Sequence, residues 1–168
     1  MNTQVVVRFA VLAAVATLLA GCSSTATGNT SSPGKPLQLR LVISSVKGAC
    51  SAPALTTDGP ASACDSTGTT TFELAKSLGV VTPTSVALPK DQGSAHSVAL
   101  EFNKADTATL GDASREAINK HLAIVLDGRV LTAALVMAPT TTSELTLAFG
   151  TASEAKQAAA ELGASATP

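Results

Sequence analysis

Apolar and polar residues alternate along several short stretches of the chain, which is the pattern of strands with one buried face. The first stretch covers residues 37–46. Its predicted inner face carries Leu37, Leu39, Leu41 and Ile43. Residues 69–74 predict a short second strand with Phe72 and Leu74 inward. Residues 75–92 contain one glycine and two prolines, and predict turns with at most one short strand or helical turn.

The second half of the chain is more regular. Residues 96–102 alternate as a strand, and residues 103–121 follow the helical period, with Asn103 or Asp106 placed to cap the start. His121 is expected at the end of this helix, where a cation is favoured. The buried face of the helix is expected to contain Leu110, Ala113, Ala117 and Ile118.

A further strand and a helix are predicted near the end of the chain, over residues 145–149 and 151–162. Thr151 and Glu154 have the spacing of a capping box, and Gly163 ends the helix. The face of this helix that turns toward the sheet carries Ala155, Ala158, Ala159 and Leu162.

Residues 122–137 contain the clearest turn signal, because two apolar, β-branched runs flank Asp127 and Gly128. A two-residue hairpin turn needs a positive φ at both central positions, which Asp tolerates and Gly adopts freely. Strands this apolar are expected at the centre of a sheet, covered on at least one face by a helix.

The order of these elements predicts the fold class. A strand, a long helix, a hairpin, a strand and a last helix give an α+β fold. We expect a two-layer sandwich, in which two main helices cover one face of a mixed or antiparallel sheet. This domain is expected over residues 37–163, with residues 164–168 as a disordered tail.

Composition limits the kinds of partner. The chain has 168 residues, of which 45% are hydrophobic but only 2% aromatic, with no Trp and no Tyr. The core must therefore be built from Leu, Val, Ile and Ala, and a platform for stacking bases or sugars is not expected. A net charge of -1 gives no basic footprint for nucleic acid.

The first 22 residues have the pattern of an export signal. Arg8 precedes an apolar run that ends in Leu-Ala-Gly-Cys at Cys22, and this resembles the lipobox of bacterial lipoproteins. The resemblance implies a signal peptide over residues 1–21 and lipid on Cys22, which would hold the protein on the extracytoplasmic face of the cell membrane. An ordinary signal peptide or an uncleaved signal anchor is the alternative. Residues 22–36 are rich in Ser, Thr, Gly and Pro, and predict a flexible tether.

Two cysteines, Cys50 and Cys64, remain once Cys22 is assigned to lipid. In an oxidising compartment they are expected to form a disulfide. The loop between them has little predicted structure of its own. A metal or redox pair is the alternative, although the chain has no C-x-x-C spacing and no histidine close by.

No catalytic motif is present: the sequence lacks G-x-S-x-G, H-E-x-x-H, a Walker loop and a dinucleotide fingerprint. His96 and His121 are the only histidines, and both are expected at the surface. We therefore expect no catalytic residue, no metal and no cofactor. An enzyme would need several acids to converge in one cleft, and the candidates are Asp106, Asp112, Glu116 and Asp127.

Residues 98–162 resemble the periplasmic head subdomain of SecD, an export-auxiliary membrane protein. In that family an alternating strand ends in Phe, a helix follows, and a signature similar to L-A-I-V-L-D-G opens a hairpin. Phe102 stands at the corresponding distance upstream, and a later Thr-led helix is matched at Thr151, Glu154 and Ala155. The signature itself corresponds to Leu122, Ala123, Ile124, Val125, Leu126, Asp127 and Gly128.

The chain departs from the SecD family in two ways. The Pro that usually follows the small residues of the hairpin is absent at Thr132, Ala133 and Ala134. A proton-driven motor needs a transmembrane bundle with carboxylates inside the membrane. The sequence has no such bundle, so we do not expect this chain to pump alone.

The resemblance implies a lipid-anchored binding module outside the membrane, which contacts exported polypeptide or the translocation machinery. The alternative is a small-ligand-binding or structural envelope lipoprotein that reuses the fold, since fold does not fix function. An apolar cleft beside the sheet would favour the alternative.

Overall fold

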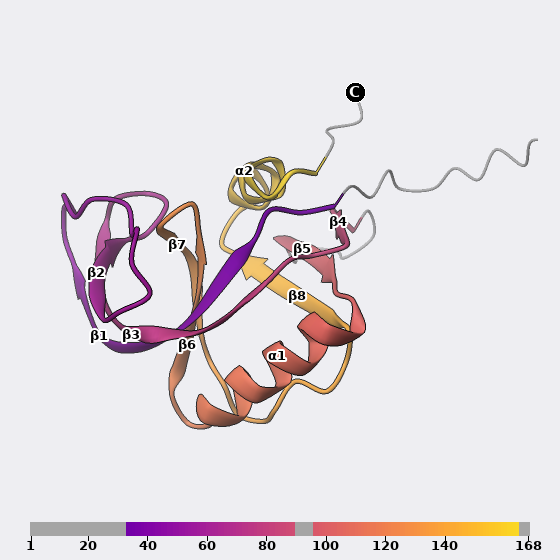
Figure 1. Cartoon of the computed structure of the whole chain (residues 1–168). Helices are drawn as coiled ribbons and strands as arrows, with labels where there is room; N and C mark the ends of the chain where they lie inside the picture. The colour runs from indigo at the N-terminus through magenta and orange to yellow at the C-terminus, as the bar shows by residue number, and fades with distance from the viewer. Residues whose placement is uncertain (1–32, 90–95, 165–168) are drawn as a thin grey trace, which may run out of the picture.

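The structure, a computed structural model, describes residues 33–89 and 96–164 (Figure 1). Cys22, the expected signal peptide and residues 165–168 of the expected tail lie outside the described residues. Within the two described ranges, no helix is long and apolar enough to cross a membrane. The elements are β1 (Leu37–Lys47), β2 (Ala61–Cys64), β3 (Thr70–Val81), β4 (Ser85–Ala87), β5 (His96–Glu101), α1 (Lys104–Glu116), β6 (His121–Leu126), β7 (Arg129–Leu135), β8 (Glu144–Phe149) and α2 (Ala152–Leu162).

The strands form two antiparallel sheets. The larger has the order β2-β3-β1-β6-β7 and the smaller has the order β4-β5-β8. Figure 1 shows α1 and α2 on different sides of the molecule: α1 packs mainly against β3, and α2 packs mainly against β5. The predicted α+β class is confirmed, and the structure adds that the strands divide between two sheets, each with a helix against it.

The main core lies between the two sheets and the helices. It takes alternate residues of β1, β5 and β6 together with one face of each helix, as the apolar periodicity predicts. Its fully or nearly buried side chains are Leu37, Leu39, Val81, Val86, Val98, Leu100, Phe102, Leu110, Ala113, Ala117, Leu122, Ile124, Leu126, Leu147, Ala155, Ala158, Ala159 and Leu162.

The larger sheet curls until its two ends meet. Asp65, directly after β2, forms a parallel bridge with Val130 of β7. The Ser66 N–H donates to the Val130 carbonyl at 3.1 Å. The curled sheet is therefore a partly closed five-stranded barrel. It encloses a second, smaller core made of Ala63, Leu74, Ala123, Val125 and Val130.

Both helices start as their sequences predict. The Asn103 side chain accepts a hydrogen bond from the Asp106 N–H at 2.9 Å, which identifies Asn103 as the cap of α1. Thr151 and Glu154 form the predicted capping box of α2, and Gly163 ends that helix with φ 100°. These caps satisfy backbone groups that the helix itself leaves without partners.

The end of α1 differs from the prediction. α1 stops at Glu116, and His121 is the first residue of β6 instead of the last residue of a helix. Asn119 has φ 60°, a conformation that asparagine adopts more readily than most residues, and it turns the chain into β6. Ile118 falls in this turn and stays 38% exposed, so it does not join the core as predicted.

Residues 75–81 lie in the region predicted as turns with at most one short strand or helical turn, and they continue β3 to Val81. Gly79 lies inside this strand, at a register shift between β1 and β3. A Cβ at residue 79 would stand 2.6 Å from Cγ2 of Thr109 in α1. The glycine therefore allows the helix to approach the strand closely. Close approach of another backbone or element is a common reason for glycine in a strand.

The inner face of β1 is also shorter than predicted. Leu37 and Leu39 are fully buried, whereas Ile43 is 68% exposed. Three register shifts against β3 fall between Leu39 and Ser44. They interrupt the alternation, so the predicted face does not continue to Ile43.

Residues 33–36, expected in the tether, lie against the domain. The Gly34 N–H donates to the Pro83 carbonyl at 2.8 Å, and the Lys35 N–H donates to the Leu162 carbonyl at 2.9 Å. These two bonds join the segment before β1 to the ends of β3 and α2. The ordered domain therefore includes residues before Leu37.

Candidate functional site

The hairpin between β6 and β7 has the predicted two-residue turn. Asp127 has φ 48° and Gly128 has φ 77°, and the flanking residues Leu126 and Arg129 are paired. Positive φ at both central positions matches the right-handed twist of the strands. The prediction that Asp127 serves turn geometry is confirmed.

The loop of residues 51–60 packs directly on this turn. The Leu55 N–H donates to the Gly128 carbonyl at 2.9 Å. A Cβ at residue 128 would lie 2.5 Å from the Leu55 nitrogen and 2.7 Å from the Leu55 oxygen. Glycine is thus required at position 128 both for its φ and for the close approach of a neighbouring backbone.

Replacing Gly128 with Ala is expected to lower the free energy of unfolding by about 2 kcal/mol, because a left-handed Ala costs about 1 kcal/mol and the Leu55 backbone must also move. Gly68→Ala is the matched control, since Gly68 has φ 69° with nothing within 4 Å of a Cβ. It should lose only about 1 kcal/mol. Urea unfolding measures both, and equal losses would show that the Leu55 contact contributes nothing.

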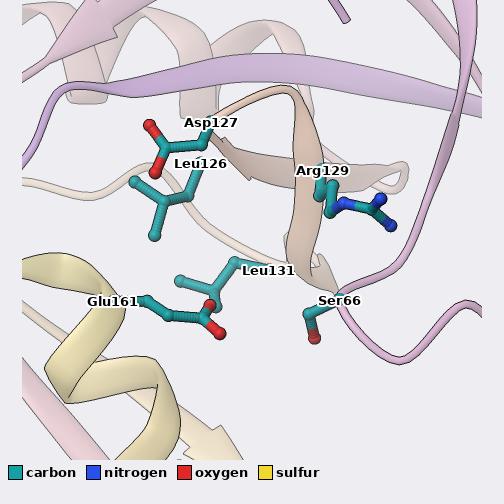
Figure 2. Close-up of a pocket in the computed structure, with 6 residues that line it drawn as sticks. All are labelled: Ser66, Leu126, Asp127, Arg129, Leu131 and Glu161. Carbon is teal, nitrogen blue, oxygen red and sulfur yellow. The ribbon is translucent and has the colours of Figure 1, made fainter. Parts of the chain in front are cut away.

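A small pocket of about 260 Å³ lies beside the turn. Figure 2 shows its residues around a common space, with Glu161 on α2 facing the hairpin across it. Asp127, at its rim, forms an ion pair of 2.8 Å with Lys35, and both side chains are about half exposed or more. Among the described residues, the lining consists of Ser66, Leu126, Asp127, Arg129, Leu131 and Glu161.

β7 is the last strand of the larger sheet, which corrects the prediction that both hairpin strands are central. β6 pairs with one side of β7. On the other side, β7 meets the described residues of the barrel at Val130, through the bridge with Asp65 and the hydrogen bond from the Ser66 N–H, and no further strand pairs with it. Most of this side of β7 is therefore an open sheet edge within the part of the chain that the structure describes.

The direction of the backbone groups on β7 follows from the residue after the strand. The Val136 N–H donates to the Lys120 carbonyl at 3.0 Å, and the Val136 carbonyl accepts from the Asn119 N–H at 2.8 Å, so both groups turn to the β6 side. Successive residues of a strand direct these groups to alternate sides. Leu135 and Ala133 therefore direct theirs to the open side.

The side chains along this edge are apolar and partly exposed. Leu135 is 50% exposed and Met137 is 71% exposed. No charged residue or histidine occurs from Val130 to Ser143. Sheet edges in proteins are usually protected by charges, proline or a covering segment. We call residues 132–137 the open β7 edge.

Arg40 is a buried charge at the end of the barrel, with no exposed surface. Its Nε donates to Gln38 at 2.7 Å, and its Nη1 donates to the carbonyls of Gly59 at 2.6 Å and Ala75 at 3.0 Å. Its Nη2 donates to the Thr57 carbonyl. The guanidinium thus binds three backbone carbonyls from the loop of residues 51–60 and from β3.

Asp58 completes this polar cluster. Burial lowers the pKa of the Arg40 guanidinium, and the Asp58 carboxylate opposes that effect by raising it. Asp58 also accepts a hydrogen bond from the Gln38 amide at 2.8 Å, while its carbonyl accepts from the Ser77 N–H at 2.8 Å. The cluster therefore fixes the loop against β1 and β3.

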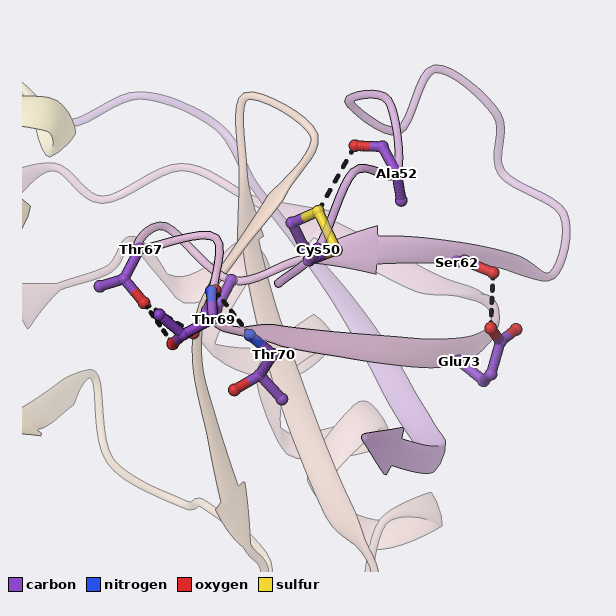
Figure 3. The surroundings of a disulfide bond; sticks show 9 residues. Cys50, Ala52, Ser62, Thr67, Thr69, Thr70 and Glu73 are labelled. Carbon is purple, nitrogen blue, oxygen red and sulfur yellow. Dashed lines mark hydrogen bonds between the residues drawn. A yellow bond between two sulfur atoms is a disulfide. The ribbon is translucent and has the colours of Figure 1, made fainter. Parts of the chain in front are cut away.

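Cys50 and Cys64 are joined by the predicted disulfide, with their Cα atoms 5.6 Å apart (Figure 3). Cys64, the last residue of β2, is 2% exposed. The bond ties the start of the loop to the second core. Together with Arg40 and Gly128, it holds residues 51–60 over the end of the barrel.

Asp65 organises the turn that closes the barrel. Burial raises the pKa of its carboxyl, but hydrogen bonds from Thr67, Thr69 and Thr70 outweigh this, so the pKa lies below its ordinary value. Figure 3 shows the threonines gathered at this turn. The Thr69 N–H is 2.8 Å from Oδ1 and the Thr67 hydroxyl is 2.9 Å from Oδ2. The turn places Ser66 against β7.

The acids considered for catalysis lie at two places. Asp106, Asp112 and Glu116 lie along α1, whereas Asp127 lies at the hairpin turn. Three of them bind neighbouring groups: Asp106 accepts from the Asn103 amide at 2.7 Å, Asp112 pairs with Arg115 at 2.5 Å, and Asp127 pairs with Lys35. Among the described residues, no three His, Cys, Asp or Glu side chains form a group that could hold a metal.

Residues 80–168 match the family described as the SecDF P1 head subdomain, and this match covers more than half of the chain. The chain belongs to that family. The predicted resemblance to the SecD head subdomain is thereby confirmed. In this chain, Leu122 to Gly128 form most of β6 and the turn that follows it.

Two solved SecDF structures share this fold. One, of SecDF described as a membrane component that enhances protein export, has a TM-score of 0.52 and 23% identity, covering 77% of this chain and 62% of that chain. A crystal structure of SecDF in a super-membrane-facing form has a TM-score of 0.51 and 23% identity, covering 76% of this chain and 18% of that chain. The present chain thus spans less than two thirds of the length of either SecDF chain. No curated protein matches it.

Two features of the site were not predicted from the sequence: the burial of Arg40 and the position of β7 at an edge. Alternation in β1 shows only that Arg40 lies on the face opposite Leu39, and it does not show whether that face meets solvent or a barrel interior. For β7, one signal was present, since the run from Val130 to Ser143 lacks any charge.

Proposed function

We propose that this protein is a non-catalytic binding module on the extracytoplasmic face of the cell membrane, held there by lipid on Cys22, and that it contacts exported polypeptide or the translocation machinery. Membership of the SecDF P1 head family carries the proposal. A related SecDF is described as enhancing protein export, and the present chain spans 62% of that structure. The proposed role is therefore the contact that a head domain makes, separate from any transport step.

The surface around the hairpin supports this proposal. The open β7 edge and the exposed Arg129 lie on one strand, and apolar side chains are accessible along it. Large exposed apolar side chains that cluster on a protein surface commonly mark contacts with other proteins. The hairpin therefore offers a surface for a polypeptide partner.

The alternative, a small-ligand-binding or structural envelope lipoprotein, would use the pocket beside the turn. Ligand sites usually have volumes of about 300–1,000 Å³ and are mostly apolar. This pocket has about 260 Å³, and three of the described residues that line it, Asp127, Arg129 and Glu161, are charged. Its size and polarity favour the polypeptide partner over a small ligand.

Site-specific photo-crosslinking in intact cells tests the proposal. A photoreactive amino acid at Arg129, which is exposed beside the turn, is expected to capture secretory chains in transit or a component of the translocation machinery, identified by mass spectrometry. The same amino acid at Lys104, exposed at the start of α1, is the matched control and should capture at least tenfold less.

A Cys22→Ala variant of the Arg129 probe reports on the anchor. Loss of lipid should release the protein from the membrane and reduce the capture, because two acyl chains supply the membrane affinity. Equal capture from Arg129 and Lys104, or capture of no exported chain and no translocation component, would contradict the proposed function.

A further inference from the structure

We propose that the open β7 edge binds an extended polypeptide segment by adding it to the larger sheet as a further strand. This inference rests on the proposed function, because it names the surface and the conformation in which exported polypeptide is held. The partner is an unfolded segment recognised mainly through its main chain.

Ala133 and Leu135 direct their N–H and C=O groups to the open side, and no described residue hydrogen-bonds them there. An extended chain presents the complementary groups at the same spacing, so strand addition satisfies them. Pairing between Thr132 and Leu135 is regular, because the bulge opposite Ile124 and Val125 lies before this part of β7.

The side chains give the edge affinity without strong sequence preference. Leu135 ends β7, and Met137 lies two residues beyond it. They are 50% and 71% exposed, and each can cover apolar side chains of an added strand. The absence of charge from Val130 to Ser143 imposes no charge requirement on the partner. Such an edge can bind segments of different sequence, because every polypeptide offers the same backbone N–H and C=O groups.

The other strand edges are less suited to this role. β4 has three residues and β2 has four, and the disulfide ties the end of β2 to the loop. β8 is longer, but its large apolar side chains serve the main core: Leu147 is buried, and Leu145 and Phe149 pack against that core. The β7 edge thus combines open backbone groups with exposed large apolar side chains.

A second copy of the chain is the other occupant to consider. Six residues of strand span about 20 Å. A single strand pair of that length buries a few hundred Å², whereas a stable dimer needs about 1,200 Å² or more. The bridge at Val130 also closes the edge at one end. The edge is therefore long enough to hold a passing segment briefly, and too short to hold two folded domains together.

The test compares Leu135→Pro with Leu135→Ala in the full chain in detergent micelles. Proline at residue 135 removes an N–H that faces the open side and keeps the bonds to β6, whereas alanine removes the side chain alone. The probe is a blocked ten-residue peptide of alternating Thr and Val. Hydrogen exchange should show at least tenfold slower exchange of the Ala133 amide with peptide in the wild type and in Leu135→Ala, and no slowing in Leu135→Pro.

Folding of each variant is checked by its melting temperature. If Leu135→Pro melts more than about 5 °C below the wild type, Met137→Pro replaces it, because Met137 is 71% exposed and lies beyond the last residue of β7. Equal slowing at Ala133 in the proline variant, or slowing confined to another surface, would overturn the inference. Slowing that needs no peptide and grows with protein concentration would assign the edge to a second copy and also overturn it.

The two proposals fail in different ways. Undiminished capture of secretory chains by the Arg129 probe in a Leu135→Pro background would reject the edge and leave the proposed function standing. No capture in cells, together with the expected exchange pattern for the peptide, would reject the proposed function and leave the edge as a strand-binding surface.

Discussion

Replacing Arg40 with Leu is expected to lower the free energy of unfolding by about 4 kcal/mol, within the range of about 3–5 kcal/mol for breaking a buried charge interaction. The substitution removes four hydrogen bonds and leaves the carbonyls of Thr57, Gly59 and Ala75 without their donor. A better-packed apolar side chain does not offset this loss, because backbone carbonyls remain buried. Urea unfolding with an unchanged slope measures the effect.

Two controls separate the geometry of Arg40 from its charge. Arg40→Lys keeps the charge but replaces a planar fork with a single ammonium, so it should recover less than half of the loss. Arg115→Leu removes an arginine whose ion pair with Asp112 is largely exposed, and should change stability by less than about 1 kcal/mol. A loss below about 1 kcal/mol for Arg40→Leu would show that water replaces the guanidinium at no great cost.

Removing the disulfide is expected to cost about 3 kcal/mol, the chain-entropy value for a loop of about 15 residues. The variant is Cys50→Ala with Cys64→Ala, and the cysteines are 14 positions apart in the sequence. Thermal and urea unfolding of the variant should match those of the wild type in reductant. The loss arises because the unfolded chain regains the freedom that the crosslink removed.

The same variant should loosen the loop locally. The Leu55 amide, which donates to the Gly128 carbonyl, is expected to exchange at least tenfold faster with deuterium. The Asp106 amide, which donates to the Asn103 side chain at the cap of α1, lies outside this loop, and its exchange rate serves as the internal control. A stability change under about 1 kcal/mol, with unchanged exchange at Leu55, would mean that Arg40 and Gly128 hold the loop without the crosslink.

Local sequence signals predicted the parts of this fold whose causes are local. The Asp127-Gly128 turn, the capping box at Thr151 and the buried face of α2 all depend on residues within a few positions of one another, and all are confirmed. The extension of β3 through Gly79 was missed because glycine is there for a contact with α1, some thirty residues away in the sequence. Sequence alone did not distinguish a glycine that makes a turn from a glycine that allows a close contact within a strand.

The candidate site was predictable only in part, for a similar reason. The hairpin was identified by its apolar strands, but its place in the sheet depends on which strands lie beside it, and alternation carries no such information. Arg40 illustrates the same limit: its partners are carbonyls of a loop that has no regular pattern. Because the larger sheet curls, the face of β1 opposite Leu39 lies against a second core instead of solvent.

The place of β1 in the larger sheet has a consequence for the order in which the strands can assemble. β1 has β3 on one side and β6 on the other. Leu126, at the end of β6, lies 79 positions after Lys47, at the end of β1, whereas β3 is complete by Val81. β1, β2 and β3 therefore wait as an incomplete barrel. Cys50 and Cys64 lie between the start of β1 and the start of β3 in the sequence, so in an oxidising compartment their crosslink is expected to form before the hairpin pairs with β1.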